Sequence, residues 1–227
     1  MNIPERYIMN MGVLSKEDFN KLQQLDVIII GLGGLGGYVA NQLIRLGVIK
    51  MTLVDFDTFS ESNLNRQLFS NANNIGEYKV DVLCSELKKI NPLASIKCIK
   101  KRIQDISDLS GDYIIDCVDN KETKIYLSKL SNKLNIPLLH GACGGWYGQV
   151  GWMSPTCTLL EELYGDEEVG LEKVFLNPPF IVNAVASVMV SEFIKMIKND
   201  SRVVLDQILL IDLLDNIVTK SGVVKND

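Results

Sequence analysis

The stretch VIIIGLGGLGGYVANQLIRLG, residues 27–47, starts with aliphatic residues, passes through a glycine-rich turn and continues with helix-favouring residues. An unbroken Val-Ile-Ile-Ile run is typical of a strand buried on both faces of a parallel sheet, so we expect a strand over 26–30. A helix is expected to follow from Gly34 to Leu46. Glycine lets the backbone turn tightly, and the free N–H groups at a helix N-terminus attract anions. The stretch therefore predicts a strand–turn–helix unit that binds a phosphate.

The rest of the chain alternates between expected strands and helices. Such alternation predicts an α/β fold, a doubly wound and mostly parallel sheet with right-handed crossovers, followed by antiparallel strands near the C-terminus. The expected parallel strands are 50–57, 95–100, 112–120 and 136–142, the expected helices are 75–90, 121–135 and 180–197, and further strands are expected over 148–155 and 207–220.

The expected domain organisation is simple. Residues 1–24 are predicted to form an N-terminal helical arm, in which Ser15 is a candidate N-cap with Asp18 three residues on. Residues 25–227 are expected to form a single domain, since this length suits one core. Within that domain, a polar crossing segment of about 155–178 shows no clear period.

Composition narrows the possible functions. Apolar residues make up 47% of the chain and the formal net charge is −5, which disfavours a nucleic-acid role through a general basic face. The N-terminus has no apolar run typical of a secretion signal, and the apolar stretch 180–190 is too short to span a bilayer. Five cysteines without a CxxC pair fit a cytoplasmic protein with no structural zinc site.

Charged side chains follow the expected strands where ligands bind to α/β sheets. Gly31, Gly33, Gly34 and Gly36 form the turn, and Asp55 ends the second strand, where a carboxylate can bind ribose hydroxyls. A triphosphate needs cations, and Arg66 and Lys79 could supply them. Asp119, just past a buried strand, could hold Mg²⁺ between phosphates. The candidate site residues at this point are Gly31, Gly33, Gly34, Gly36, Asp55, Arg66, Lys79 and Asp119.

Each of these residues also has a plainer interpretation. Arg66 and Lys79 taken singly could be ordinary exposed cations, and Asp119 could cap the helix that follows it. A glycine turn alone also fits NAD in an oxidoreductase. That reading leaves the two cations and Asp119 without a role, and it supplies no acid or base for hydride transfer.

Several motifs in order resemble one family over residues 5–200. The chain is similar to the ThiF/MoeB/HesA family, relatives of the ubiquitin-activating enzymes, which implies a Rossmann-like fold. The resemblance implies adenylation of the C-terminal glycine carboxylate of a ubiquitin-like sulfur carrier (ThiS/MoaD-like) with ATP and Mg²⁺. The motifs that carry it are GLGGLG, DFDTFSESNLNRQ, IGEYKV, INP, DCVDN and IPLLHGA.

The resemblance also implies residue roles. Asp55 would bind ribose, Arg66 and Lys79 would bind phosphates and act in catalysis, and Asp119 would hold Mg²⁺. Asn63 would orient the phosphates. By position, the implied ATP contacts are Gly34, Asp55, Ser62, Asn63, Arg66, Lys79, Asp119 and Asn120.

The sequence departs from the family pattern at several places. The two CxxC pairs that bind zinc in family members are missing, so we expect no zinc site, and no cysteine follows Cys157. We therefore expect adenylation without an enzyme thioester and treat Cys143 and Cys157 as structural thiols. Met9 stands where the family has an arginine that reaches the neighbouring subunit's ATP, and Lys124 replaces a second arginine.

Other readings remain open. His140, the single histidine, is expected in the core or at the crevice rim, and Trp146, Tyr147 and Trp152 could line a groove for a carrier tail or belong to the core. The resemblance implies a homodimer. Met9 keeps open a non-catalytic ATP-binding scaffold or partner subunit, and the activated carboxylate could belong to a molecule other than a protein.

Overall fold

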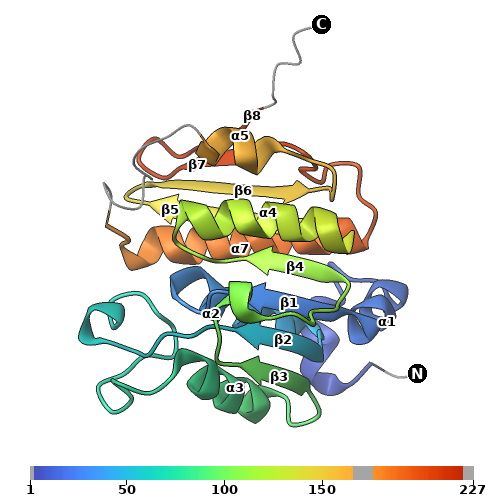
Figure 1. Cartoon of the computed structure of the whole chain (residues 1–227). Coiled ribbons are helices and arrows are strands. Elements are labelled where there is room, and N and C mark those ends of the chain that lie inside the picture. Colours follow the sequence, from blue (N-terminus) through green and yellow to red (C-terminus); the bar gives the residue numbers. More distant parts are fainter. Residues whose placement is uncertain (1–2, 166–175, 222–227) are drawn as a thin grey trace, which may run out of the picture.

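The computed structural model of the protein describes residues 3–165 and 176–221, which form an α/β fold around one sheet (Figure 1). Within these residues the sheet has eight strands in the order β3-β2-β1-β4-β5-β6-β7-β8. The first five are parallel and the last three antiparallel, as expected. The strands are β1 (Asp26–Ile30), β2 (Lys50–Val54), β3 (Ser95–Ile99), β4 (Tyr113–Asp116), β5 (Leu138–Gly144), β6 (Tyr147–Met153), β7 (Ile208–Asp212) and β8 (Ile217–Ser221).

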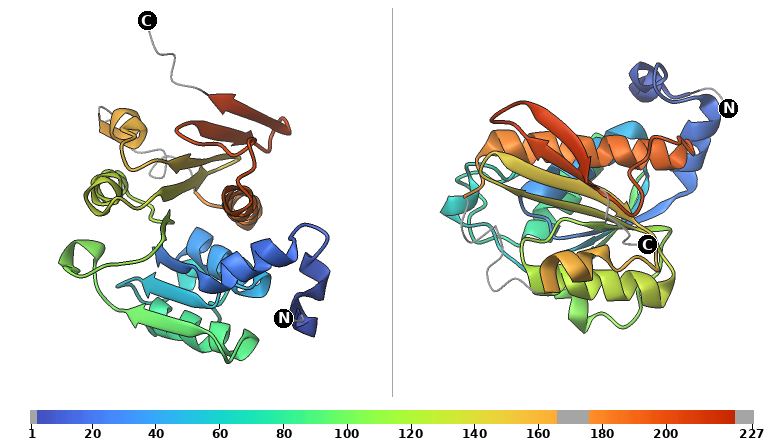
Figure 2. Two further views of the ribbon diagram at one scale, coloured as in Figure 1. Left: turned by 90° about the vertical axis from the view of Figure 1, so that its right-hand side faces the viewer. Right: turned by 90° about the horizontal axis from the view of Figure 1, so that it is seen from above.

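Helices cover both faces of the sheet (Figure 2). The helices α1, α2, α3 and α7 contribute to one apolar cluster, and α4 and α5 contribute to the cluster on the opposite face. The helical elements are η1 (Glu5–Asn10), α1 (Lys16–Gln24), α2 (Gly34–Leu46), η2 (Glu61–Asn63), α3 (Lys79–Ile90), η3 (Ile103–Asp105), α4 (Lys121–Leu134), α5 (Leu159–Gly165) and α7 (Pro179–Ile197).

The strand–turn–helix unit forms as the sequence predicts. Four of the five β1 residues are buried, and α2 begins at Gly34 directly after the turn. The helix ends at Leu46, and Gly47 caps it with a left-handed φ of 118°, which suits a residue without a side chain. At the N-terminal arm, the Ser15 side chain accepts from the Asp18 N–H and Asp18 accepts from Ser15, which completes a capping box.

The strand order creates a crevice between β1 and β4. The connections from β1 through α2 and from β4 through α4 pass on opposite faces, so the loops at the carboxyl ends of these strands diverge. Ligands of doubly wound sheets bind in such crevices.

Some element boundaries differ from expectation. The helix expected over 75–90 begins only at Lys79, because Phe59 and Gly76 pair their backbones in a loop before it. The crossing segment expected without regular structure contains α5, which packs through Leu160 and Tyr164 against the sheet. The part of that segment over 166–175 lies outside the described residues.

The helix α7 is long and apolar enough, by length and composition only, to cross a membrane. It instead contacts α2, β5 and β6, and Val185, Met189 and Phe193 are fully buried there. Its apolar character is therefore that of a core helix.

A disulfide joins Cys84 of α3 to Cys98 of the edge strand β3. The sequence does not predict this pair, since the spacing of cysteines does not reveal which of them meet in space. The bond attaches α3 to the edge of the sheet, and α3 carries Lys79 at its first position.

Candidate nucleotide site

A cavity of about 310 Å³ opens at the carboxyl ends of the parallel strands. It combines the glycine turn after β1, the ends of β2, β3 and β4, the N-terminus of α3 and part of β5. The expected site residues among its lining are Gly31, Gly33, Gly34, Asp55, Arg66, Lys79, Asp119 and Asn120.

The glycine turn is shaped by two close backbone approaches. Gly31 has a left-handed φ of 85°, and a Cβ there would lie 2.8 Å from the Cys117 carbonyl oxygen. A Cβ at Gly36 would lie 1.9 Å from the Gly31 carbonyl oxygen. Gly36 does not line the cavity, so its role is to let α2 approach the turn and direct its N-terminus into the crevice.

Asp55 joins the glycine turn to β2. Its Oδ2 accepts from the backbone N–H of Leu32 at 2.6 Å, and its Oδ1 accepts from the N–H of Asp57 at 2.8 Å. Burial raises the pKa of Asp55, which these hydrogen bonds and nearby Lys79 partly offset. Each carboxylate oxygen keeps a second lone pair, so Asp55 can still accept from a ribose hydroxyl at the cavity wall.

Lys79 is a buried cation at the start of α3. Its Nζ lies 3.1 Å from Asp57 Oδ2, and its side chain is 8% exposed while that of Asp57 is 50% exposed. The ion pair holds the ammonium at the cavity wall, where a phosphate can join or replace the exposed carboxylate.

Arg66 lines the same cavity from the loop after η2. Its Nη1 donates to the Ser62 carbonyl at 2.9 Å and to Asn65 Oδ1 at 2.8 Å. The guanidinium has five N–H donors, so these bonds leave donors for a phosphate.

Ser62 and Asn63 do not line the cavity, unlike the other expected ATP contacts. The Ser62 Oγ lies 3.0 Å from Ser60 Oγ, and Asn63 Oδ1 accepts from the Ser60 N–H at 3.1 Å. Both residues belong to the η2 turn, and their hydrogen bonds hold the loop that carries Arg66.

Gln67 is a cavity residue that the sequence analysis missed. Its side chain is buried, with 6% of the residue exposed. Among the buried side-chain nitrogen and oxygen atoms of the described residues, Gln67 Oε1 is the one without a hydrogen-bond partner. A Cβ at Gly33 would lie 3.5 Å from its Nε2, so the amide lies beside the glycine turn. A buried amide oxygen without a hydrogen-bond partner lowers the stability of the fold unless a ligand or a water molecule donates a hydrogen bond to it. The NLNRQ motif contains this residue but gives no sign of its burial.

The β4 end presents Asp119 and Asn120 to the cavity. Asn120 caps α4 by accepting from the Thr123 N–H at 2.9 Å, so the cap that Asp119 could have supplied belongs to Asn120. Asp119 is exposed at the rim. Magnesium commonly takes one or two protein carboxylates together with phosphate oxygens and water, and Asp119 fits that role.

No group of three or more His, Cys, Asp or Glu residues in the described ranges is arranged to hold a metal by itself. The expected absence of a zinc site stays a prediction.

Two further cations line the cavity after β3. Lys101 and Arg102 are both exposed, and the Arg102 Cζ lies 4.2 Å from the ring centroid of Phe56. The sequence analysis did not select them because only the end of β3 brings them to the crevice.

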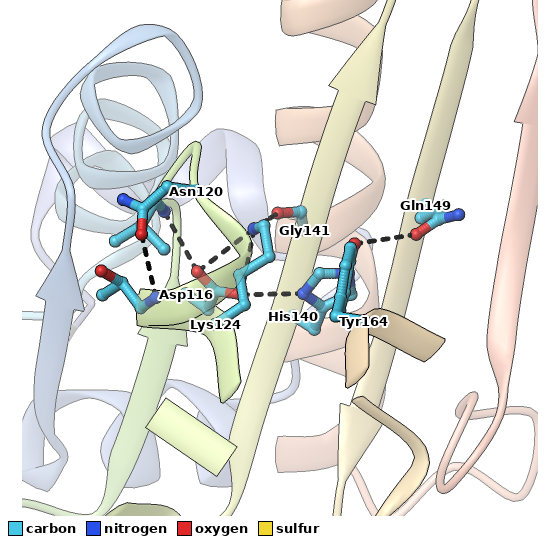
Figure 3. A network of polar contacts seen from close by, with 9 residues as sticks. Asp116, Asn120, Lys124, His140, Gly141, Gln149 and Tyr164 are labelled. Carbon is cyan, nitrogen blue, oxygen red and sulfur yellow. Dashed lines mark hydrogen bonds and ion pairs between the residues drawn. The ribbon is translucent and has the colours of Figure 1, made fainter. Parts of the chain in front are cut away.

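A buried polar network lies behind the cavity, between β4, β5, α4 and α5 (Figure 3). Lys124 Nζ lies 3.2 Å from Asp116 Oδ2 and donates to the Gly141 carbonyl at 3.0 Å. Asp116 Oδ2 lies 2.8 Å from His140 Nδ1, and Tyr164 Oη lies 3.3 Å from His140 Nε2. Lys124 thus fixes the core behind the cavity and does not reach into it.

The network sets the charge of its members. Burial alone would raise the pKa of Asp116, but Lys124 and His140 more than offset this and lower it. Burial and the charge of Lys124 lower the pKa of His140. Because Lys124 already neutralises Asp116, His140 is neutral, donates from Nδ1 and is a core histidine.

The thiols and aromatic residues separate into core and rim. Burial raises the pKa of Cys157 to about 11, which makes a poor nucleophile. Cys143 lines the cavity and its Sγ lies 3.8 Å from Asn177 Oδ1.

Trp152 is fully buried, which excludes it from a groove, whereas Trp146 and Tyr147 are exposed.

Within the described part of the N-terminal arm, residues 3–24, no arginine or lysine lines the cavity. Met9 is 93% exposed, and Arg6 Nη1 donates to Asn91 Oδ1 at 3.3 Å. Neither residue lines the cavity of this chain.

The fold and the cavity define an α/β protein with a Rossmann-like crevice for a nucleotide. The ThiF family profile matches residues 5–226, and the chain belongs to the ThiF family. Membership confirms the enzyme class expected from the sequence, a ThiF-type adenylyltransferase.

The chain is similar to curated proteins of two kinds. It is 30% identical to the molybdopterin-synthase adenylyltransferase of Haemophilus influenzae, over 88% of this chain and 87% of that protein. It is 35% identical to the tRNA threonylcarbamoyladenosine dehydratase of the same organism, over 55% of this chain and only half of that protein.

A solved structure confirms the fold. E. coli MccB with ATP superposes with a TM-score of 0.82 over 97% of this chain and 72% of that chain, at 23% identity.

Proposed function

We propose that this protein uses Mg·ATP to adenylate the C-terminal glycine carboxylate of a ubiquitin-like sulfur carrier of the ThiS/MoaD kind. The observation that carries the proposal is the cavity, which brings a glycine turn, Asp55, Arg66, Lys79 and Asp119 together. The similarity to a molybdopterin-synthase adenylyltransferase along most of both chains supports this choice of acceptor.

The residues of the chain would act by binding and charge stabilisation. The acceptor carboxylate oxygen bonds to the α-phosphorus while the bond to pyrophosphate breaks, so no protein nucleophile is required. Arg66 and Lys79 stabilise the charge on the phosphates, and Asp55 fixes the ribose. Magnesium, held through Asp119, would supply further charge neutralisation between phosphates.

The test is ATP–pyrophosphate exchange with Mg²⁺, with and without carriers that end in Gly-Gly. Carrier-dependent exchange supports the proposal. ATP binding without exchange for every acceptor would instead favour a non-catalytic scaffold or partner subunit, the reading that Met9 suggests.

A second candidate is adenylation of a carboxylate on a tRNA base or another non-protein acceptor. It is favoured by the 35% identity to a tRNA threonylcarbamoyladenosine dehydratase over about half of each chain. Exchange stimulated by tRNA and by no carrier protein would select this candidate.

We further propose that the protein acts as a homodimer. The resemblance noted from the motifs supports this assembly, and the exposed side chain of Met9 is free for contact with a partner subunit. Sedimentation velocity with and without ATP tests the oligomeric state.

A further inference from the structure

A second cavity of about 370 Å³ lies beside the nucleotide cavity. The two share Ala142 and Cys143 of β5, so they border the same segment of one strand. Apolar surface dominates this second cavity, whereas polar surface dominates the first. None of the residues assigned to ATP lines it.

The sheet register explains the shape of this cavity. Ala142 pairs with Gln149, Gln149 with Leu210, and Leu210 with Thr219, so one row of side chains crosses β5, β6, β7 and β8. Side chains on one face alternate along each strand, and this row shares the face covered by α5. The Tyr164 ring of α5 borders the row, and its Oη lies 3.1 Å from Gln149 Oε1.

We infer that this second cavity, which we call the side-chain pocket, binds an aliphatic residue of the acceptor a few positions before its reacting carboxylate. The inference rests on the proposed adenylation and names a feature of the substrate. A carboxylate at the phosphates directs the preceding residues past Ala142 and Cys143 and along the row.

The strand spacing gives the position of the selected residue. Four strands about 4.8 Å apart span roughly 14 Å, which an extended chain covers in about four residues. Two terminal glycines would pass the shared strand without filling the side-chain pocket, because they have no side chains. A leucine-sized side chain near the fourth position from the end would lie against Leu210 and Tyr164.

The chemistry of the walls favours an uncharged aliphatic group. Leu210 and Ile217 are 39% and 49% exposed, so part of their apolar surface is available for contact. The Oδ1 atom of Asp212 accepts from the N–H groups of Leu214 and Asp215, so the β7–β8 turn engages one oxygen of this carboxylate.

The test uses two acetylated hexapeptides, Ala-Ala-Leu-Ala-Gly-Gly and Ala-Ala-Ala-Ala-Gly-Gly. Binding is measured by calorimetry with a non-hydrolysable ATP analogue, and turnover by ATP–pyrophosphate exchange. We expect about tenfold tighter binding of the leucine peptide, the effect of burying one such side chain. Equal binding, or no binding at millimolar peptide, overturns the inference.

Two variants separate the side-chain pocket from general effects. Leu210→Trp fills the pocket and should abolish the preference for leucine. Val218→Trp is the control, because Val218 is exposed on the neighbouring strand β8 and does not line the side-chain pocket. A preference that survives Leu210→Trp overturns the inference.

The two proposals fail in different ways. Exchange with both peptides and no preference leaves the proposed function intact and refutes the side-chain pocket. Leucine-selective binding, together with no exchange for either peptide or for any carrier that ends in Gly-Gly, supports the side-chain pocket and refutes the proposed adenylation.

Discussion

His140 Nδ1 donates to Asp116 Oδ2 at 2.8 Å, and both side chains are fully buried. Lys124 supplies the positive charge that balances the Asp116 carboxylate. The imidazole of His140, whose pKa is lowered, is neutral and only donates a hydrogen bond. The arrangement makes the fold sensitive to protonation at one site.

We predict that stability falls as the pH drops below about 6.5. The pKa of His140 is lowered in the folded state, so between the folded and unfolded values the unfolded chain binds the extra proton. The loss approaches about 1.4 kcal/mol per pH unit when one proton separates the two states. His140 is the only histidine, so His140→Gln should flatten the slope of unfolding free energy between pH 5 and 6.5, measured by urea denaturation. An unchanged slope contradicts the prediction.

Removing Lys79 should disable catalysis without unfolding the protein. Its partner Asp57 is half exposed, so Lys79→Met leaves a solvated carboxylate and little destabilisation. We expect a loss of about 10²–10³ in the exchange rate, the usual cost of one preorganised charge donor. Lys100→Met is the matched control, because Lys100 pairs with Asp81 outside the nucleotide cavity. Equal losses in the two variants would argue against the assigned role.

Gln67→Leu should move stability and nucleotide affinity in opposite directions. The substitution removes a buried carbonyl oxygen without a protein partner, so the unfolding temperature should stay level or rise. The affinity for ATP should fall by about tenfold, the effect of one lost hydrogen bond. Thermal unfolding measures the unfolding temperature, and calorimetric titration measures the affinity for ATP. If Gln67 served only to stabilise the fold, the substitution would lower the unfolding temperature and the ATP affinity together.

Reduction of the Cys84–Cys98 disulfide should destabilise the fold by about 3 kcal/mol, the loop-closure effect for a separation of 14 residues. Unfolding of oxidised protein with and without a phosphine reductant measures it. Cys98→Ser should abolish the response to reductant, whereas Cys157→Ser should retain it because Cys157 is a free thiol. Five cysteines that alkylate before reduction would contradict the assignment.

The sequence predicted what local patterns determine. The aliphatic run of β1, the turn at Gly31 and the helix from Gly34 follow from neighbouring residues, and the structure has them with the expected bounds. The cavity likewise brings together Asp55 and Lys79, because Asp55 follows the end of β2 and Lys79 begins α3, which contacts β2.

The sequence did not predict what distant contacts determine. The burial of Gln67, the arrival of Lys101 at the crevice and the Cys84–Cys98 bond depend on packing between separate elements. The resemblance placed Ser62 among the ATP contacts, yet Ser62 does not line the cavity and its Oγ lies beside Ser60 Oγ in the η2 turn.

The single sheet has a consequence for how acceptor choice could change. The loops at the carboxyl ends of its parallel strands line the candidate nucleotide cavity, and the β7–β8 hairpin supplies Leu210 and Thr219 to the side-chain pocket. The hairpin contributes no residue to the nucleotide cavity. If this hairpin alone were exchanged between related chains, the preference for an acceptor would change with it. The backbone hydrogen bonds between β6 and β7 would join the new hairpin to the unchanged sheet.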